Sequence, residues 1–236
     1  MLVERMNIKE ITMEVLNDYF AICASSTLNR LAMEYYRERS KLHIKKEDEY
    51  HRCYEFKSKS KNNWILSLYK DHDLKKLQKI EDCTFFLYTY YYTGKNISII
   101  RIAPNDKLEF YYGHLFARYR ERMGLDMPNL LDVVKYYLRI NSKSWNRKLP
   151  EKDGQIKVIG TLSCGFQLGE YDKENQCDVF KTFIPFATAN LLTKADRRET
   201  INNIKQNLLN WNPYDGEDYY KDMSFYLNIL ENEEKK

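Results

Sequence analysis

The sequence predicts an α+β fold in which an antiparallel β-sheet is segregated from helical N-terminal and C-terminal flanks. Apolar residues recur at helical spacing over residues 8–40, whereas residues 84–112 combine strand composition with short turns. No alternation of strands and helices that would indicate a parallel sheet is visible. We therefore expect a single domain over all 236 residues, with a helical N-terminal lobe at 1–49 and an α+β core unit at about 50–186.

The first part of the chain is predicted to hold two helices, or one bent helix, from Ile8 to about Ser40. The run Ser25-Ser26-Thr27 interrupts the apolar periodicity, and serine and threonine are favoured N-cap residues. Residues 50–56 and 64–69 then alternate apolar and polar side chains around a Lys/Ser/Asn turn, which predicts a hairpin. A short charged helix or loop is expected at 71–82.

A β-meander is predicted next, because Thr84–Thr93 is rich in aromatic and β-branched residues. Turns at Gly94–Asn96 and Pro104–Asp106 lead into two further strands, Ile97–Ala103 and Leu108–Tyr112. Pairing with the preceding hairpin would extend this meander to five strands.

Two helices are predicted to follow the meander. The first runs from about His114 to Met123 and ends at Gly124, a plausible C′ glycine, and the second begins after Pro128-Asn129. Strand composition then returns in three segments, Ile156–Leu162, Phe166–Tyr171 and Val179–Ile184. Gly160, Gly165 and Gly169 in this region are typical of bulges or close approaches. From about residue 188 the chain is predicted to be mostly helical.

Composition excludes several classes of protein. A net charge of +4, spread along the chain, does not by itself indicate nucleic-acid binding. The apolar runs are far shorter than the 18 or so residues of a membrane helix, so we expect a cytoplasmic protein with no membrane partner. The 5 cysteines are odd in number and widely spaced, and His43, His51 and His72 are scattered, so no metal site and no cofactor are predicted.

The 20 tyrosines are the outstanding compositional feature. Tyrosine suits half-buried sheet faces, where its ring packs and its hydroxyl reaches water or a partner. It also suits stacking on nucleic-acid bases. A third interpretation is a subunit interface in a homodimer, formed by the tyrosine-rich meander around Tyr90 and Tyr92.

One group of residues suggests chemistry. At 100° per residue, His114, Arg118 and Glu121 fall within about 60° of one another on the predicted helix, and Arg122 lies beside them. A helix N-terminus, an imidazole and arginine side chains together can bind a phosphate and transfer a proton. These are the components of a metal-independent ribonuclease site.

An ordinary structural role explains the same residues. An arginine and a glutamate three positions apart are common on a solvated helix face, where such a pair contributes only a few tenths of a kcal/mol. In that interpretation His114 caps the helix or donates to a backbone carbonyl, and Arg118 and Glu121 have no binding role.

The motif His114-x-x-x-Arg118-Tyr119-x-Glu121-Arg122, with the later strands, resembles uncharacterised bacterial proteins that carry a His-x-x-x-Arg-Tyr-x-Glu-Arg element. The order of elements is more distantly similar to small RelE-type and colicin-type ribonuclease toxins. This resemblance implies that His114 is a general base or acid, that Arg118 and Arg122 bind phosphate, and that Thr182 contributes a polar group from the sheet. It covers about a third of the chain, and the long helical flanks depart from those short toxins.

A second, weaker candidate lies in the first hairpin. Its basic residues alternate with aromatic ones, a pattern that can grip a nucleic-acid backbone and stack on bases: Arg52, Lys57, Lys59 and Lys61 with Tyr50, Tyr54, Phe56 and Trp64. Charged hairpin tips also protect sheet edges from aggregation on ordinary proteins.

The sequence thus predicts a cytoplasmic protein that binds or cleaves RNA, or another phosphate-bearing ligand, through His114, Arg118 and Arg122 with Glu121 and Thr182 in support. It leaves open whether the protein is an enzyme. The alternative is a non-catalytic interaction or structural protein with the tyrosine-rich interface.

Overall fold

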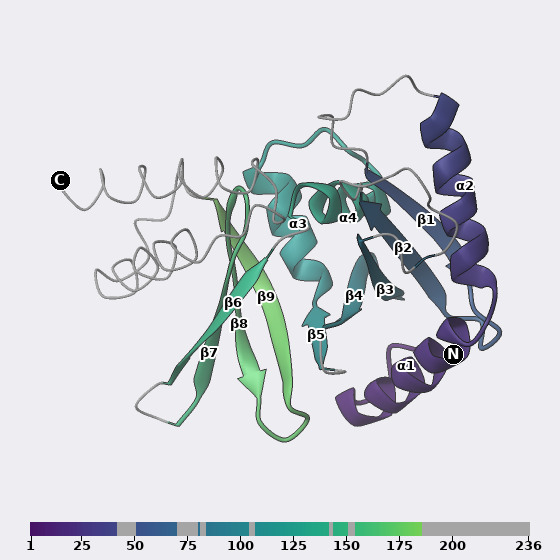
Figure 1. The fold of residues 1–236 in the computed structure, drawn as a ribbon. Helices are drawn as coiled ribbons and strands as arrows, with labels where there is room; N and C mark the ends of the chain where they lie inside the picture. The colour runs from purple at the N-terminus through teal and green to yellow at the C-terminus, as the bar shows by residue number, and fades with distance from the viewer. Residues whose placement is uncertain are drawn as a thin grey trace, which may run out of the picture.

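The structure is a computed structural model that describes these parts of the chain: residues 1–41, 51–69, 80, 84–103, 107–141, 144–150 and 154–185. Figure 1 shows a long, strongly twisted β-sheet with helices packed against it. The predicted C-terminal helical flank and nearly all of the charged segment 71–82 lie outside the described residues. Among the described helices, none carries an apolar stretch long enough to span a membrane.

The chain begins with two helices, α1 (Ile8–Cys23) and α2 (Thr27–Lys41). Asn7 caps α1, because its side chain accepts from the backbone N–H of Glu10 while the Glu10 side chain accepts from the backbone N–H of Asn7. The helices separate at the predicted serine-rich break. The expected pair of helices is therefore confirmed.

Five strands follow in the order of the chain and pair as one antiparallel meander: β1 (His51–Lys57), β2 (Asn63–Tyr69), β3 (Thr84–Thr93), β4 (Asn96–Ile102) and β5 (Leu108–Tyr111). The predicted hairpin and the predicted meander thus form one continuous sheet. Gly94 has a φ of +59°, the left-handed conformation that the tight β3–β4 turn requires.

Two helices follow β5 along the chain and precede the remaining strands: α3 (Gly113–Arg122) and α4 (Leu130–Ile140). Gly124 has a φ of +61° directly after the C-cap of α3, which confirms the predicted terminating glycine. The Asn129 side chain accepts from the backbone N–H of Leu131 and caps α4.

Four more strands complete the fold: β6 (Trp145–Pro150), β7 (Ile156–Thr161), β8 (Gly165–Asp172) and β9 (Cys177–Pro185). The order across the nine-stranded sheet is β1-β2-β3-β4-β5-β9-β8-β7-β6. Sequence reasoning missed β6, because it is an edge strand with little apolar alternation that ends in a proline.

The two halves of the sheet meet in a parallel pair, which the sequence did not predict. Glu109 of β5 lies opposite Asp178 of β9, and Tyr111 lies opposite Phe180. The connection between these strands contains two helices and three strands, so no local strand–helix–strand pattern reveals it. The α+β class and the mostly antiparallel sheet are nevertheless confirmed.

Helices α1 and α2 cover one face of the sheet, and α3 and α4 cover the other. Each face has its own hydrophobic core. Side chains alternate between these faces along every strand. Trp64 and Leu66 of β2 pack with α1 and α2, whereas Ile65 between them packs with α3 and α4. The α3/α4 face is rich in aromatic rings, including Tyr111, stacked on Phe180 with 5.2 Å between ring centroids.

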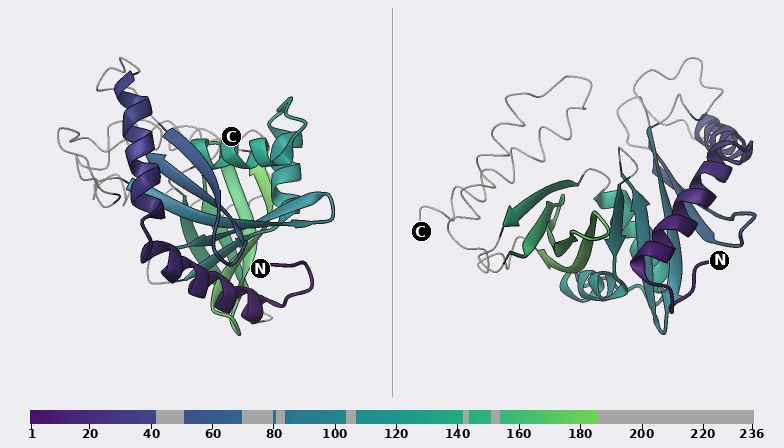
Figure 2. Two further views of the ribbon diagram at one scale, coloured as in Figure 1. Left: turned by 90° about the vertical axis from the view of Figure 1, so that its right-hand side faces the viewer. Right: turned by 90° about the horizontal axis from the view of Figure 1, so that it is seen from below.

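The half of the sheet formed by β6 to β9 curls back toward β4 and β5, as Figure 2 shows. Asn146 of β6 donates to Glu109 of β5 over 2.7 Å, although three strands separate them in the sheet. Arg101 of β4 donates to the Ser144 hydroxyl over 3.3 Å. Side-chain hydrogen bonds therefore close the curled half of the sheet where no backbone pairing does.

Candidate functional site

The α3 helix is fixed tightly against the sheet at its first residue. A Cβ atom on Gly113 would lie 3.0 Å from the backbone of Ile97 and closer still to Asn96, so only glycine permits this approach. Leu115, Phe116 and Tyr119 bury the inner side of the helix. The opposite side faces solvent, as helical periodicity predicts.

The exposed side of α3 brings three of the predicted site residues together. Arg118 donates from Nε to Nε2 of His114 over 3.4 Å and from a terminal nitrogen to Glu121 over 2.8 Å. The side chains of Arg118 and Glu121 remain 40% and 64% exposed. His114 therefore presents Nε2 as an acceptor beside a guanidinium that still has unused N–H groups.

Arg122 makes a contact that the sequence does not predict. Its guanidinium donates to the backbone carbonyl of Phe183 in β9. This bond ties the last turn of α3 to the curled half of the sheet. A phosphate at Arg122 would have to compete with that carbonyl.

Thr182 does not join the group. Phe183 packs beneath α3, with its ring centroid 4.8 Å from that of Tyr119. Because successive side chains of a strand point to opposite faces, Thr182 points to the face away from α3. The structure thus brings together His114, Arg118 and Glu121, and separates Thr182 from them.

A buried polar network lies on the inner side of α4, and sequence reasoning did not find it. Tyr137 donates to Gln167, Gln167 donates to Asn146 over 3.2 Å, and Asn146 donates to Glu109. Tyr111 donates to the other Glu109 oxygen over 2.7 Å. Burial raises the pKa of both tyrosines, which keeps their hydroxyls as donors. These residues come from four elements, α4, β5, β6 and β8, so no sequence motif marks them.

A histidine and a cysteine lie side by side in β1. His51 Nε2 is 2.7 Å from the Ser67 hydroxyl and 3.6 Å from the Cys53 sulfur. Burial, with the nearby charges of Arg139 and Arg52, lowers the pKa of His51 to about 4, and burial raises the pKa of Cys53 to about 11. Both groups are therefore neutral near pH 7, and the pair lacks the thiolate that a nucleophilic cysteine needs.

Metal binding also finds no support in the described ranges, where no three His, Cys, Asp or Glu side chains gather in an arrangement that would hold an ion.

The predicted aromatic and basic surface of the first hairpin is divided by the sheet. Tyr54, Phe56 and Trp64 pack toward α1 and α2, and Trp64 is fully buried with its indole N–H donating to Asp18 over 2.7 Å. Trp64 is therefore not available to stack on bases, and Tyr54 and Phe56 are partly buried, so the hairpin does not present these three rings as one exposed surface. Tyr50 lies outside the described residues.

Lys57 and Lys61, at the hairpin tip, lie near β3 and the N-terminal residues. A cavity of about 320 Å³ lies between the hairpin tip, the end of β3 and residues 1–4. Lys57, Lys61 and Tyr92 line it. Tyr92 is 54% exposed. Sequence spacing gave no signal for this cavity, because β3 and the N-terminal residues are distant from the hairpin along the chain.

Comparisons of the chain with protein-family models, with curated proteins and with solved structures give no match. The resemblance to bacterial proteins with the His-x-x-x-Arg-Tyr-x-Glu-Arg element therefore stays a prediction.

Proposed function

We propose that the exposed side of α3 binds RNA through its phosphate groups, and that His114 transfers a proton there. The observation that carries the proposal is the contact of Arg118 with His114 over 3.4 Å on an exposed, rigidly held helix face. An arginine beside the imidazole can hold a phosphate oxygen while the imidazole serves a neighbouring hydroxyl. Glu121 positions Arg118 through its 2.8 Å bond.

Cleavage at this site would follow the metal-independent route of many ribonucleases. The Nε–H of Arg118 turns from His114 to a phosphoryl oxygen, which frees the lone pair of Nε2. Nε2 of His114 then takes the proton of the ribose 2′-hydroxyl, and the 2′ oxygen bonds to phosphorus. The bond from phosphorus to the 5′ oxygen breaks, and that oxygen takes a proton from solvent. Arg118 stabilises the charge that develops on the phosphoryl oxygens.

The test is incubation of the purified chain with single-stranded RNA at low salt in the presence of a chelator. Binding that weakens in Arg118→Ala, and cleavage that disappears in His114→Ala, would support the proposal. Arg120→Ala is the matched control, because Arg120 belongs to the same helix but points toward the Met127 carbonyl. Absence of binding, or equal losses in the Arg118 and Arg120 variants, would refute it.

Binding without cleavage would keep the binding role of Arg118 and remove the catalytic role of His114. The sequence also left open a non-catalytic alternative. That alternative, a tyrosine-rich subunit interface, depends on Tyr92, since Tyr90 is buried and donates its hydroxyl to Glu55 over 3.1 Å. Light scattering on the purified chain and on Tyr92→Ala tests it. A dimer that dissociates in this variant would support an interface.

A further inference from the structure

The cavity at the hairpin tip exists because β2 is shorter than its neighbour. Strand β2 pairs with β3 only as far as Asn63, which lies opposite Tyr90. Strand β3 continues to Thr93 in its pairing with β4. Residues 91–93 therefore have no described strand beside them on the β2 side, and the cavity of about 320 Å³ opens there.

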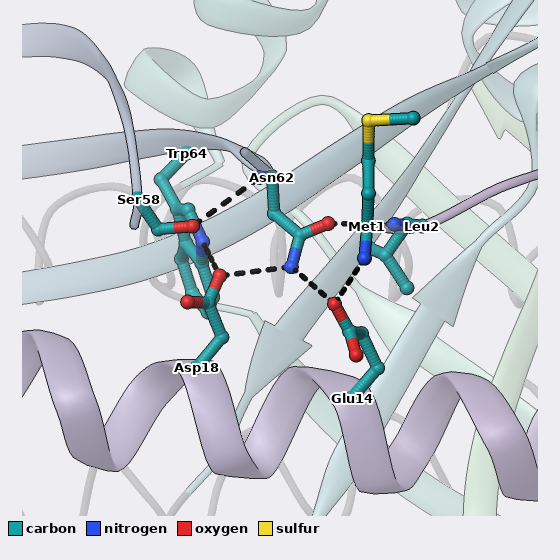
Figure 3. A network of polar contacts seen from close by, with 7 residues as sticks. All are labelled: Met1, Leu2, Glu14, Asp18, Ser58, Asn62 and Trp64. Carbon is teal, nitrogen blue, oxygen red and sulfur yellow. Dashed lines mark hydrogen bonds and ion pairs between the residues drawn. The ribbon is translucent and has the colours of Figure 1, made fainter. Parts of the chain in front are cut away.

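Hydrogen bonds hold one lining residue of this cavity, Asn62, in place. Asn62 is buried, and its side-chain NH2 group donates to Asp18 over 2.9 Å and to Glu14 over 3.1 Å. Its side-chain oxygen accepts from the backbone N–H of Leu2 over 2.6 Å. Figure 3 shows Asn62 between α1 and the N-terminal residues, with Trp64 donating to the same carboxylate of Asp18. The network fixes the hairpin loop and the N-terminal segment relative to each other.

This arrangement forces Lys61 into an unfavourable backbone conformation. Lys61 has a φ of +64°, which a lysine rarely adopts and glycine or asparagine adopts readily. The Lys61 N–H donates to the Ser58 carbonyl, and the Ser58 N–H donates to the Asn62 carbonyl, both over 3.0 Å, so the turn itself requires this φ. A non-glycine residue held in such a conformation is more common at functional sites.

The charges around the cavity favour an anion. Among the described residues, the ammonium groups of Lys57 and Lys61 have no hydrogen-bond or ion-pair partner. Both line the cavity, together with the single carboxylate of Glu4. Two cations against one anion leave a net positive charge, and an ammonium without a partner is ready to bind phosphate.

The aromatic wall favours a ligand with a flat ring. Tyr92 is 54% exposed and packs edge to face against Tyr90, with 6.1 Å between ring centroids. The contact with Tyr90 holds the Tyr92 ring in place while leaving it accessible. An exposed, oriented tyrosine is a stacking platform for a nucleobase. The Asn63 amide, which also lines the cavity, can hydrogen-bond to a base edge.

The geometry points to a nucleotide-binding site in this cavity, where Lys57 and Lys61 hold the phosphate and Tyr92 stacks on the base. The ligand is a nucleoside phosphate, either free or at the 5′ end of an RNA strand. The site uses none of the α3 residues, so it goes beyond the proposed function and stands or falls separately from it.

Equilibrium titration of the full chain with adenosine monophosphate, with inorganic phosphate and with RNA carrying or lacking a 5′ phosphate tests this inference. Lys57→Ala should weaken nucleotide binding about tenfold, since one charge-assisted contact is lost. Lys59→Ala is the matched control, because Lys59 is exposed in the same loop but does not line the cavity. Tyr92→Leu should weaken the binding of the nucleotide and leave that of inorganic phosphate unchanged.

The conformation of Lys61 supplies a second, sharper variant. Lys61→Gly should leave the free energy of unfolding unchanged or raise it, because glycine accepts the positive φ, while nucleotide binding falls about tenfold. Lys57→Ala should weaken binding of the mononucleotide by the same factor in the Arg118→Ala background as in the natural chain, which separates this site from α3. RNA binding that depends on the 5′ phosphate would identify a strand end as the ligand, and binding of the mononucleotide alone would identify a free nucleotide. Failure of all these ligands to bind, or equal losses in the Lys57 and Lys59 variants, would overturn the inference.

Discussion

Stability should depend on pH through His51. The pKa of this imidazole is about 4 in the folded chain, against an ordinary value of 6.5. Its ring is surrounded by the Tyr69 ring at 4.5 Å between centroids and by the Ser67 hydroxyl, with the positive charges of Arg139 and Arg52 nearby. Burial, together with these two positive charges, therefore makes a protonated imidazole unfavourable at this position and lowers its pKa.

The sign and size of the pH effect on stability follow from the two pKa values of His51, 6.5 in the unfolded chain and about 4 in the folded one. As the pH falls below 6.5, the unfolded chain binds the proton first, so the folded state loses relative stability until the pH reaches about 4. One pKa unit corresponds to 1.36 kcal/mol, so a difference of 2.5 units between 6.5 and 4 gives about 3 kcal/mol. This contribution is fully present above pH 6.5 and is lost below pH 4.

Urea denaturation at pH 7 and pH 4 of the natural chain and of His51→Gln measures this contribution. Glutamine can still hydrogen-bond to Ser67 and does not titrate, while every carboxylate is common to both proteins. The natural chain should lose about 3 kcal/mol more than the variant between the two pH values. Equal losses would show that His51 is protonated as easily in the folded chain as in the unfolded one.

Two further substitutions probe the packing around the proposed sites. Asp18→Ala removes the acceptor of the Trp64 indole and of the Asn62 amide, both buried, and should lower the free energy of unfolding in urea by about 2 to 4 kcal/mol; a loss below about 1 kcal/mol would contradict this. Gly113→Ala places a Cβ atom 3.0 Å from the backbone of Ile97 and should lower the Tm and weaken RNA binding at α3 by displacing the helix. An unchanged Tm would show that the helix has room to move.

Local patterns predicted most of the elements of this fold because the physical causes are local. The serine-rich break between α1 and α2, the capping asparagine of α4 and the terminating glycine of α3 each act within a few residues. The parallel pairing of β5 with β9 depends instead on how two sheet halves pack, which no local pattern encodes. Strand β6 was missed because an edge strand needs fewer apolar residues than a central one.

The candidate site on α3 was predictable for the same reason, and only as far as the helix extends. Helical periodicity correctly grouped His114, Arg118 and Glu121 on one face. The bond from Arg122 to the Phe183 carbonyl and the orientation of Thr182 both depend on the docking of α3 against β9. Neither could be derived from spacing along the chain.

The first hairpin shows how strand alternation can mislead. Aromatic and basic residues adjacent in sequence suggested one surface, but a period of two places neighbours on opposite faces. Phe56 and its cross-strand partner Trp64 therefore pack toward α1 and α2. Lys57, which follows Phe56, lies opposite Asn63, and both belong to the other face of the sheet. The tyrosines that line the cavity with the lysines, among them the exposed Tyr92, come instead from β3.

The two proposed sites are connected through the sheet. Gly113, the first residue of α3, lies against Ile97 of β4, and Ile97 is the cross-strand partner of Tyr92 in β3. A single RNA strand that contacts both sites would bind more tightly than either half, because its second contact is intramolecular. Affinity should then rise steeply once an oligonucleotide is long enough to reach both, and either Arg118→Ala or Lys57→Ala should abolish that rise. A smooth dependence on length in the natural chain would mean that the sites bind separate molecules.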